Sequence, residues 1–304
     1  MTDNNNRQED ADENSFYVGI DDDKSRLDFN GLFSYPFTNV RLLCSTPGGV
    51  AELYTATRYG RRYILKGLKS EYRNDPVYAL ALVKEFEIGI ALEHPHIRRT
   101  LGLESVEGLG KVIVMEYIDG STLKELIDSG KLEFLAARDL LAQIAQALDY
   151  MHDKQIFHRD LKPSNILVTR GSAAVKIIDF SLSDSDDSIV LKNPAGSMKY
   201  MAPEQCGMQG APSPATDIYS LGVIMKEIAA VTGDDDMAYI AKKFMCQNPD
   251  KRPKSLSAIK FLSSDNSFGG ILSRFLSSKL LTYILVAISL ALTAYVVYLF
   301  STNF

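Results

Sequence analysis

One short stretch of this chain, IFHRDLKPSNILV at residues 156–168, constrains its fold more than any other. A histidine, an arginine, an aspartate, a lysine and an asparagine fall within eight positions, between two apolar ends. Ionised groups beside residues that favour burial lose part of their hydration. This costs free energy unless ion pairs or hydrogen bonds replace the lost water contacts. The stretch therefore predicts a functional loop at the edge of a hydrophobic core.

The residues around this loop follow two different periodicities. Residues 38–118 contain β-rich runs separated by Gly-containing turns, with one helical stretch at 75–93. From residue 121 onward, apolar residues recur mainly at helical spacing. This order predicts an α+β fold, in which a small β-rich lobe precedes a larger helical lobe and a cleft lies between them. The helical stretch places four apolar residues on one face: Leu80, Val83, Phe86 and Ile90.

The loop and its neighbours resemble the motifs of eukaryotic-type protein kinases, in the family's order and near its spacing. HRDLKPSN at 158–165 resembles the catalytic loop H-R-D-L-K-P-x-N, and KIIDF at 176–180 resembles the following metal-binding motif. The Lys-Pro pair in the loop is similar to the serine/threonine class. The resemblance runs from about Thr38 to Leu262 and implies the bilobal protein-kinase fold.

This resemblance implies a division of the chain into parts. The kinase domain would span 31–263, with the N-lobe at about 31–118 and the C-lobe at about 119–263. Residues 1–30 are expected to form an acidic, disordered tail, because the first 23 residues carry eight Asp or Glu and one basic residue, Arg7. Residues 264–279 are expected to link the domain to the apolar segment that follows.

The resemblance also implies the chemical roles. Phosphoryl transfer demands mainly positioning and charge neutralisation. Asp160 would accept the proton of the attacking hydroxyl, and Lys162 would contact the transferring phosphoryl group. Asn165 and Asp179 would bind Mg2+, with Mn2+ as an alternative. Arg159 would bind an anion on the activation segment.

A further set of residues would bind ATP. Lys66 would hold the α- and β-phosphates, and Glu85 would pair with that lysine. Glu87 is the weaker candidate, because two residues along a helix point about 200° apart. The other implied ATP contacts are Gly48, Gly49, Leu53, Ile64, Met115, Glu116, Ile118 and Leu167.

Other implied residues are structural or regulatory. Glu204 in MAPE would pair with Arg252, Asp217 would hold the catalytic-loop backbone, and Ser197 would bridge Asp160 and Lys162. Three serines of the activation segment are candidates for autophosphorylation and pairing with Arg159: Ser183, Ser185 and Ser188. The alternatives are that the neighbouring aspartates supply the anion permanently, or that the segment is solvated.

The chain departs from the family pattern in four places. The glycine-rich loop falls on TPGGVAEL at 46–53 and keeps only Gly48 at the expected positions, which predicts reduced nucleotide affinity. Ile64 narrows the roof over adenine, and Ser181 replaces the glycine of DFG. The stretch before NPDKRP leaves room for one helix, where the family usually has a further helix that docks substrates and partners.

Three functions compete. The leading one is an active serine/threonine protein kinase that uses Mg-ATP and phosphorylates protein substrates. The alternative is a pseudokinase scaffold, which the eroded glycine loop would indicate. Against it, the chain keeps all five principal catalytic and nucleotide-binding residues: Lys66, Glu85, Asp160, Asn165 and Asp179. A kinase of small molecules or lipids is disfavoured by GSMKYMAPE at 196–204, a protein-kinase feature. The net charge of −5 argues against a nucleic-acid partner.

The segment LLTYILVAISLALTAYVVYLF at 280–300 predicts a transmembrane helix. Its 21 uncharged residues would span about 31 Å, close to the thickness of a bilayer's hydrocarbon core. A buried C-terminal helix, the alternative, would normally show a polar face. Arg274 and Lys279 flank the N-terminal side, so the kinase domain is expected in the cytoplasm of a tail-anchored, single-pass protein. Tethering would favour homodimers that phosphorylate each other in trans.

Overall fold

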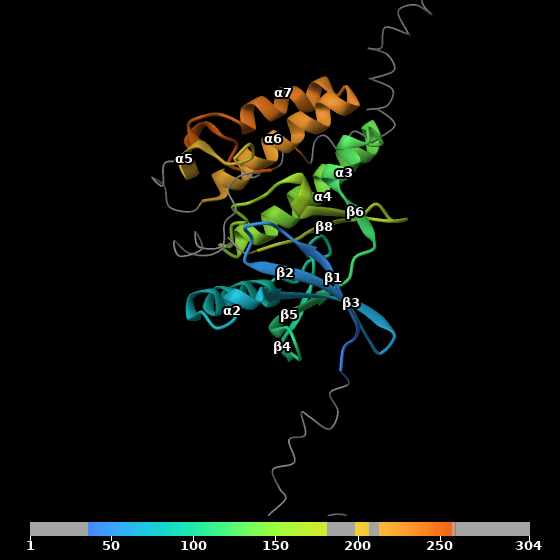
Figure 1. The fold of residues 1–304 in the computed structure, drawn as a ribbon. Helices are drawn as coiled ribbons and strands as arrows, with labels where there is room; N and C mark the ends of the chain where they lie inside the picture. Colours follow the sequence, from blue (N-terminus) through green and yellow to red (C-terminus); the bar gives the residue numbers. More distant parts are fainter. Residues whose placement is uncertain (1–35, 181–197, 207–212, 257–258, 260–304) are drawn as a thin grey trace, which may run out of the picture.

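The computed structural model describes residues 36–180, 198–206, 213–256 and 259, and their ribbon shows two lobes (Figure 1). The predicted transmembrane segment, Ser181 and the serines at 183, 185, 188 and 197 lie outside these residues. Within the described ranges, no helix is long and apolar enough to cross a membrane. The membrane expectation therefore stays a prediction.

The first lobe contains one antiparallel sheet of five strands in the order β1-β2-β3-β5-β4. Both faces of the central strands β3 and β5 are buried, by one apolar cluster around Ile64, Met115 and Leu82 and another around Leu65 and Val114. The strands are β1 (Thr38–Ser45), β2 (Ala51–Arg58), β3 (Arg61–Leu68), β4 (Thr100–Val106) and β5 (Gly110–Glu116).

Helix α2 (Pro76–Ala91) packs against β3 and β4. Asp75 starts the helix, because its carboxylate accepts a hydrogen bond from the Val77 amide and Pro76 follows at the first helical position. Gly89 allows the close approach to β4, since a Cβ there would lie 2.3 Å from Oγ1 of Thr100. This packing fixes the face from which α2 presents Glu85.

The buried face of α2 differs from the apolar face predicted by the sequence. Leu80 and Ile90 are 56% and 48% exposed, whereas Leu82, Glu85 and Gly89 are buried. Val83 and Phe86 are half-buried. Relative to the prediction, the helix is rotated so that Glu85 faces the interior, where it forms an ion pair with the buried Lys66.

The second lobe is mainly helical and contains the largest apolar core (Figure 1). A small sheet in the order β6-β7-β8 lies at its junction with the first lobe. Its strands are β6 (Gly120–Thr122), β7 (Ile166–Thr169) and β8 (Val175–Ile177); its helices are α3 (Leu123–Asp128), α4 (Phe134–Asp153), α5 (Pro203–Cys206), α6 (Pro214–Thr232) and α7 (Asp235–Phe244). Three short 3-10 turns complete the described elements: η2 (Ser70–Tyr72), η3 (Pro163–Asn165) and η5 (Pro249–Lys251).

Helix α6 is the central element of this lobe, with eleven buried residues along its length. It ends at Gly233, which adopts the left-handed conformation, and α7 begins two residues later. Residues 213–256 are described throughout, and α7 is the one α-helix in them between α6 and η5. The single helix expected there is therefore confirmed.

The two lobes are joined by backbone pairing as well as by the chain. Ile97, in the loop before β4, forms a β-bridge with Ile177 of β8. The amide of Arg98 donates to the Ile177 carbonyl at 2.9 Å, and the Ile177 amide donates to the His96 carbonyl at 2.8 Å. These bonds hold the β8 end, and the residues that follow it, against the first lobe.

Candidate active site

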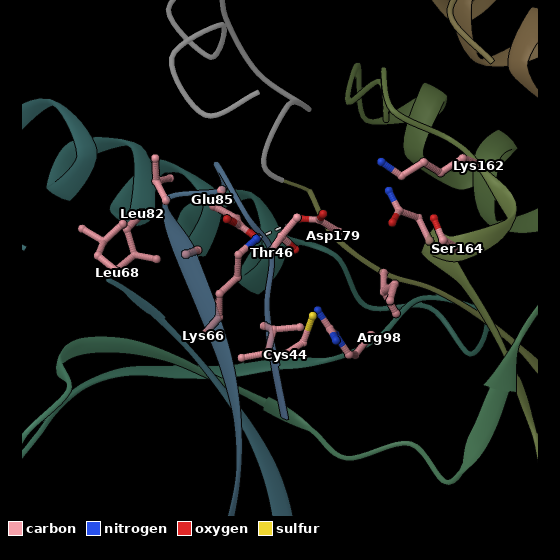
Figure 2. Close-up of a pocket in the computed structure, with 16 residues that line it drawn as sticks. Cys44, Thr46, Lys66, Leu68, Leu82, Glu85, Arg98, Lys162, Ser164 and Asp179 are labelled. Atoms are coloured by element: carbon pink, nitrogen blue, oxygen red, sulfur yellow. Dashed lines mark hydrogen bonds and ion pairs between the residues drawn. The ribbon is translucent and has the colours of Figure 1, made fainter. Parts of the chain in front are cut away.

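A cavity of about 390 Å³ lies between the lobes, a volume typical of small-molecule sites (Figure 2). Its walls come from β1, β2, β3, α2, the loop before β4, the catalytic loop and the segment after β8. The predicted residues that line it are Gly49, Leu53, Lys66, Glu85, Lys162, Asn165 and Asp179. The other lining residues are Cys44, Thr46, Val50, Ala51, Leu68, Leu82, Arg98, Ser164 and Ile178.

Three charged side chains meet on one side of the cavity (Figure 2). Nζ of Lys66 in β3 lies 2.6 Å from Oε1 of Glu85 in α2 and 2.8 Å from Oδ1 of Asp179 after β8. Burial alone would lower the pKa of Lys66, but the carboxylates of Asp179 and Glu85 outweigh it and raise that pKa above its ordinary value. Lys66 is therefore a fixed positive charge at neutral pH.

Glu85 has the least exposed side chain of the three. Its side chain is 6% exposed, and burial raises its pKa, although the charge of Lys66 offsets part of that rise. Glu87 is exposed. The choice of Glu85 over Glu87 therefore agrees with the observed rotation of the helix.

The catalytic loop brings an acid, a cation and an amide together. Oδ2 of Asp160 accepts a hydrogen bond from Nζ of Lys162 at 2.7 Å. Nδ2 of Asn165 donates to the Asp160 carbonyl at 2.9 Å. The amide oxygen of Asn165 therefore points away from that bond, and Asn165 lines the same cavity as Asp179.

The Asn165 and Asp179 side chains fit a hard divalent cation. Both offer oxygen atoms, and Mg2+ is commonly held by one or two protein carboxylates, waters and substrate phosphates. No group of three or more His, Cys, Asp or Glu that could hold a metal occurs among the described residues. Asn165 and Asp179 alone would leave coordination positions of such a cation open.

The catalytic-loop backbone is held in place by Asp217 of α6. This carboxylate is fully buried and accepts hydrogen bonds from the amides of His158 at 2.9 Å and Arg159 at 2.8 Å. Nε2 of His152 lies 2.9 Å from the same carboxylate. Burial alone would raise the pKa of Asp217, but the contact with His152, helped by the Arg159 amide, keeps that pKa below its ordinary value.

The backbone itself is strained at two site residues. Arg159 and Asp179 have φ of 63° and 69°, in the left-handed region that residues other than glycine rarely adopt. Nε2 of His158 contacts the carbonyl of Ile178 at 3.2 Å, which links the catalytic loop to the segment carrying Asp179. Such strain is typical of functional sites, where surrounding hydrogen bonds hold an unfavourable conformation.

A second buried ion pair supports the site from the C-lobe. The Arg252 guanidinium contacts both carboxylate oxygens of Glu204, at 2.6 and 2.8 Å, and the Arg252 side chain is fully buried. Gln205, the neighbour of Glu204, donates to the Arg159 carbonyl at 2.9 Å. The segment at 203–206 is thereby connected to the catalytic loop.

Several predicted nucleotide-binding residues lie outside the walls of this cavity. Ile64 and Met115 face each other across β3 and β5 and are buried in the sheet core. The side chain of Glu116 accepts hydrogen bonds from Lys176 and from the Arg99 amide. The remaining three are Gly48 in the turn after β1, Ile118 after β5 and Leu167 in β7.

Cys44 and Arg98 are among the lining residues that sequence reasoning missed. Cys44 pairs with Leu53 across β1 and β2, so both occupy the roof of the cavity. Arg98 is 5% exposed and follows the motif HPHI. The sequence offered one signal for Arg98: a charged residue directly follows the apolar residue Ile97, which is completely buried in the structure.

Comparisons with known proteins agree with this geometry. The family model described as "Protein kinase domain" matches residues 46–235. The chain is 34% identical to serine/threonine-protein kinase PknA of Mycobacterium tuberculosis over 224 residues, which covers 69% of this chain and 51% of the relative. It is 34% identical to serine/threonine-protein kinase PknB of Mycobacterium leprae over 197 residues, which covers 62% of this chain and 31% of the relative.

One solved structure shows the same fold. The kinase domain of Mycobacterium tuberculosis PknI, crystallised as a double mutant, superposes with a TM-score of 0.58 at 19% identity. The match covers 76% of this chain and 97% of that structure. The chain spans between about a third and a half of the length of the two curated relatives. Since the family model covers more than half of this chain, the chain belongs to the protein kinase domain family.

Proposed function

We propose that this chain is a serine/threonine protein kinase that binds Mg-ATP and transfers the γ-phosphate to protein hydroxyls. The observation that carries the proposal is the convergence of Lys66, Asn165 and Asp179 on one cavity, with the Lys162–Asp160 pair at its edge. These groups come from separate elements of both lobes. They supply the cations, metal ligands and base that phosphoryl transfer requires.

Each residue has a distinct part in the proposed reaction. Asp160 accepts the proton of the substrate hydroxyl. The hydroxyl oxygen bonds to the γ-phosphorus while the bond between that phosphorus and the ADP oxygen breaks, and ADP leaves. Lys162, 2.7 Å from that carboxylate, lies beside the phosphoryl group in transit. Lys66 binds the phosphates that remain on ADP. A divalent cation held by Asn165 and Asp179 would supply neutralisation of phosphate charge.

Serine and threonine hydroxyls are the proposed acceptors. The support is the Lys-Pro pair of the catalytic loop and the similarity to PknA and PknB, which are named as serine/threonine-protein kinases. We expect the full chain, purified in mild detergent and incubated with Mg-ATP labelled at the γ-phosphate, to form acid-stable phosphoserine or phosphothreonine on itself and on an added protein. Phosphoamino-acid analysis measures both.

Two outcomes would contradict this assignment. Label found only on tyrosine would exclude the serine/threonine class. Nucleotide binding at millimolar ATP with no label on any protein would favour the scaffold function instead. Mass spectrometry of the labelled chain would also test autophosphorylation at Ser183, Ser185 or Ser188, since the proposal that phosphate there pairs with Arg159 requires modification of that segment.

We further propose that the segment at 280–300 holds the kinase domain on the cytoplasmic face of a membrane. Deletion of residues 280–304 is expected to move the protein from the carbonate-resistant membrane fraction to the soluble fraction, because the hydrophobic span is removed. Fractionation followed by immunoblotting measures the shift. A matched deletion of residues 1–14 should leave the membrane fraction unchanged. Full-length protein that carbonate extracts from membranes would refute the span.

A further inference from the structure

We propose that Arg98 binds the nucleotide phosphates in this cavity. The proposal rests on the proposed function, because it concerns the same nucleotide site. Arg98 is not one of the residues through which the sequence resemblance implies contact with ATP. Two features of Arg98 support the proposal: the way its backbone is held and the state of its guanidinium.

The position of Arg98 is fixed by the junction between the lobes. Its amide donates to the Ile177 carbonyl, and the preceding residue, Ile97, is fully buried in a β-bridge to Ile177. Arg99, the next residue, is exposed, whereas Arg98 is 5% exposed and lines the cavity. Figure 2 shows the Arg98 side chain extending into the space that Lys66 and Asp179 also border.

The Arg98 residue is largely buried, and its guanidinium faces the cavity without a bonded partner in the described part of the chain. No hydrogen bond or ion pair joins it to another described side chain, although a guanidinium carries five N–H donors. Burial lowers the pKa of Arg98, and the carboxylates of Asp179, Glu85 and Glu116 act in the opposite direction. Because an arginine pKa lies far above neutrality, the side chain stays charged.

A guanidinium that lines a cavity and is largely removed from bulk water favours an anionic ligand. Lys66 already contacts both Glu85 and Asp179 directly, so Arg98 is attracted to those carboxylates only from a greater distance. Asp179 would also be engaged by a divalent cation in the loaded site. The phosphates of a nucleotide would then be the anions available to Arg98.

The surroundings favour phosphate over the base as the contact. Among the carboxylates that raise the pKa of Arg98, Asp179 has the largest effect and Glu85 the next. Both contact Lys66, which is expected to hold the phosphates. A guanidinium also matches phosphate oxygens, which it can bind in a two-pronged arrangement. Arg98 would therefore add a second cation to Lys66 and offset part of the loss of backbone contacts at the eroded glycine loop.

Binding of ADP and adenosine to the full chain tests this inference. Arg98→Met removes the charge and keeps much of the length of the side chain. We expect its ADP affinity, measured by calorimetry in EDTA and again in Mg2+, to fall about 10- to 100-fold, the effect of a hydrogen bond to a charged group. Adenosine affinity should stay within about twofold, because adenosine lacks phosphates. The ratio of the two affinities in one preparation does not depend on the folded fraction.

Two control variants sharpen the test. Arg99→Met changes the exposed neighbour and should leave both affinities as in the wild type. Arg98→Lys keeps the charge and should retain part of the ADP affinity. Unchanged ADP affinity in Arg98→Met, or an equal loss for adenosine, would overturn the phosphate contact. A wild-type chain that binds neither ligand would instead overturn the proposed function itself.

Discussion

Replacing Asp217 with asparagine is expected to reduce the free energy of unfolding by about 3–5 kcal/mol, the cost of breaking a buried charged network. The carboxylate accepts hydrogen bonds from the His158 and Arg159 amides and contacts His152. An asparagine would turn an NH2 group toward at least one of these donors, and the position is fully buried. Denaturant unfolding of the full chain in detergent measures the change.

The expected pH dependence follows from the lowered pKa of Asp217. The folded protein binds fewer protons at this group than the unfolded chain, so its contribution is complete well above the ordinary aspartate pKa of about 3.9. That contribution is lost as the pH falls through the lowered pKa of the folded state. The unfolding free energy of Asp217→Asn should therefore fall less steeply than that of the wild type in acid.

Asp128→Asn is the matched control for this substitution. Asp128 lies on the surface of α3, where it pairs with Lys124 one helical turn earlier and its side chain is 57% exposed. Exposed pairs of this kind contribute about 0–1 kcal/mol. The role assigned to Asp217 would be contradicted if Asp217→Asn changed the free energy of unfolding as little as Asp128→Asn does.

The catalytic loop could be predicted from sequence because its roles are encoded locally. Asp160, Lys162 and Asn165 lie within six residues of one another, and the Lys162 and Asn165 side chains both donate hydrogen bonds to Asp160. Lys66, Glu85 and Asp179 are far apart in sequence, and their meeting depends on the packing of α2 and on the join between β8 and the first lobe. Only the resemblance to a family could indicate that contact.

The orientation of α2 shows where periodicity fails. Leu80 and Ile90 belong to the apolar stripe of the sequence, yet they are exposed. The buried face is set by Glu85, which must reach Lys66, and by Gly89, which permits the approach to β4. The spacing of apolar residues predicts which face of a helix is buried on average. It cannot predict that one ion pair will be buried on that helix.

The cavity wall shows a second limit. Cys44 reaches the roof through the register of β1 on β2, and that pairing contains two irregularities that an alternation pattern does not reveal. Arg98 and Arg99 are adjacent and chemically identical, but only Arg98 is buried. Their difference comes from the bridge between Ile97 and Ile177, a contact between residues far apart in the chain.

Asp160→Asn is expected to lower the rate of phosphate transfer about 10²- to 10⁴-fold, the range for loss of a general base. Asparagine keeps the shape of the side chain but cannot accept the hydroxyl proton. The nucleotide phosphates are assigned to Lys66, and Asp160 does not line the cavity, so ADP affinity should stay close to that of the wild type. Asp128→Asn should keep both the rate and the affinity.

The most direct test of the phosphotransfer site is label transfer from Mg-ATP by wild type and Asp160→Asn, each at an ATP concentration that gives equal nucleotide occupancy. The structure predicts rapid labelling of serine or threonine by the wild type and labelling at least about 100-fold slower by the variant. Equal rates in the two proteins, or no labelling by a wild type saturated with nucleotide, would contradict a phosphotransfer site built around Asp160.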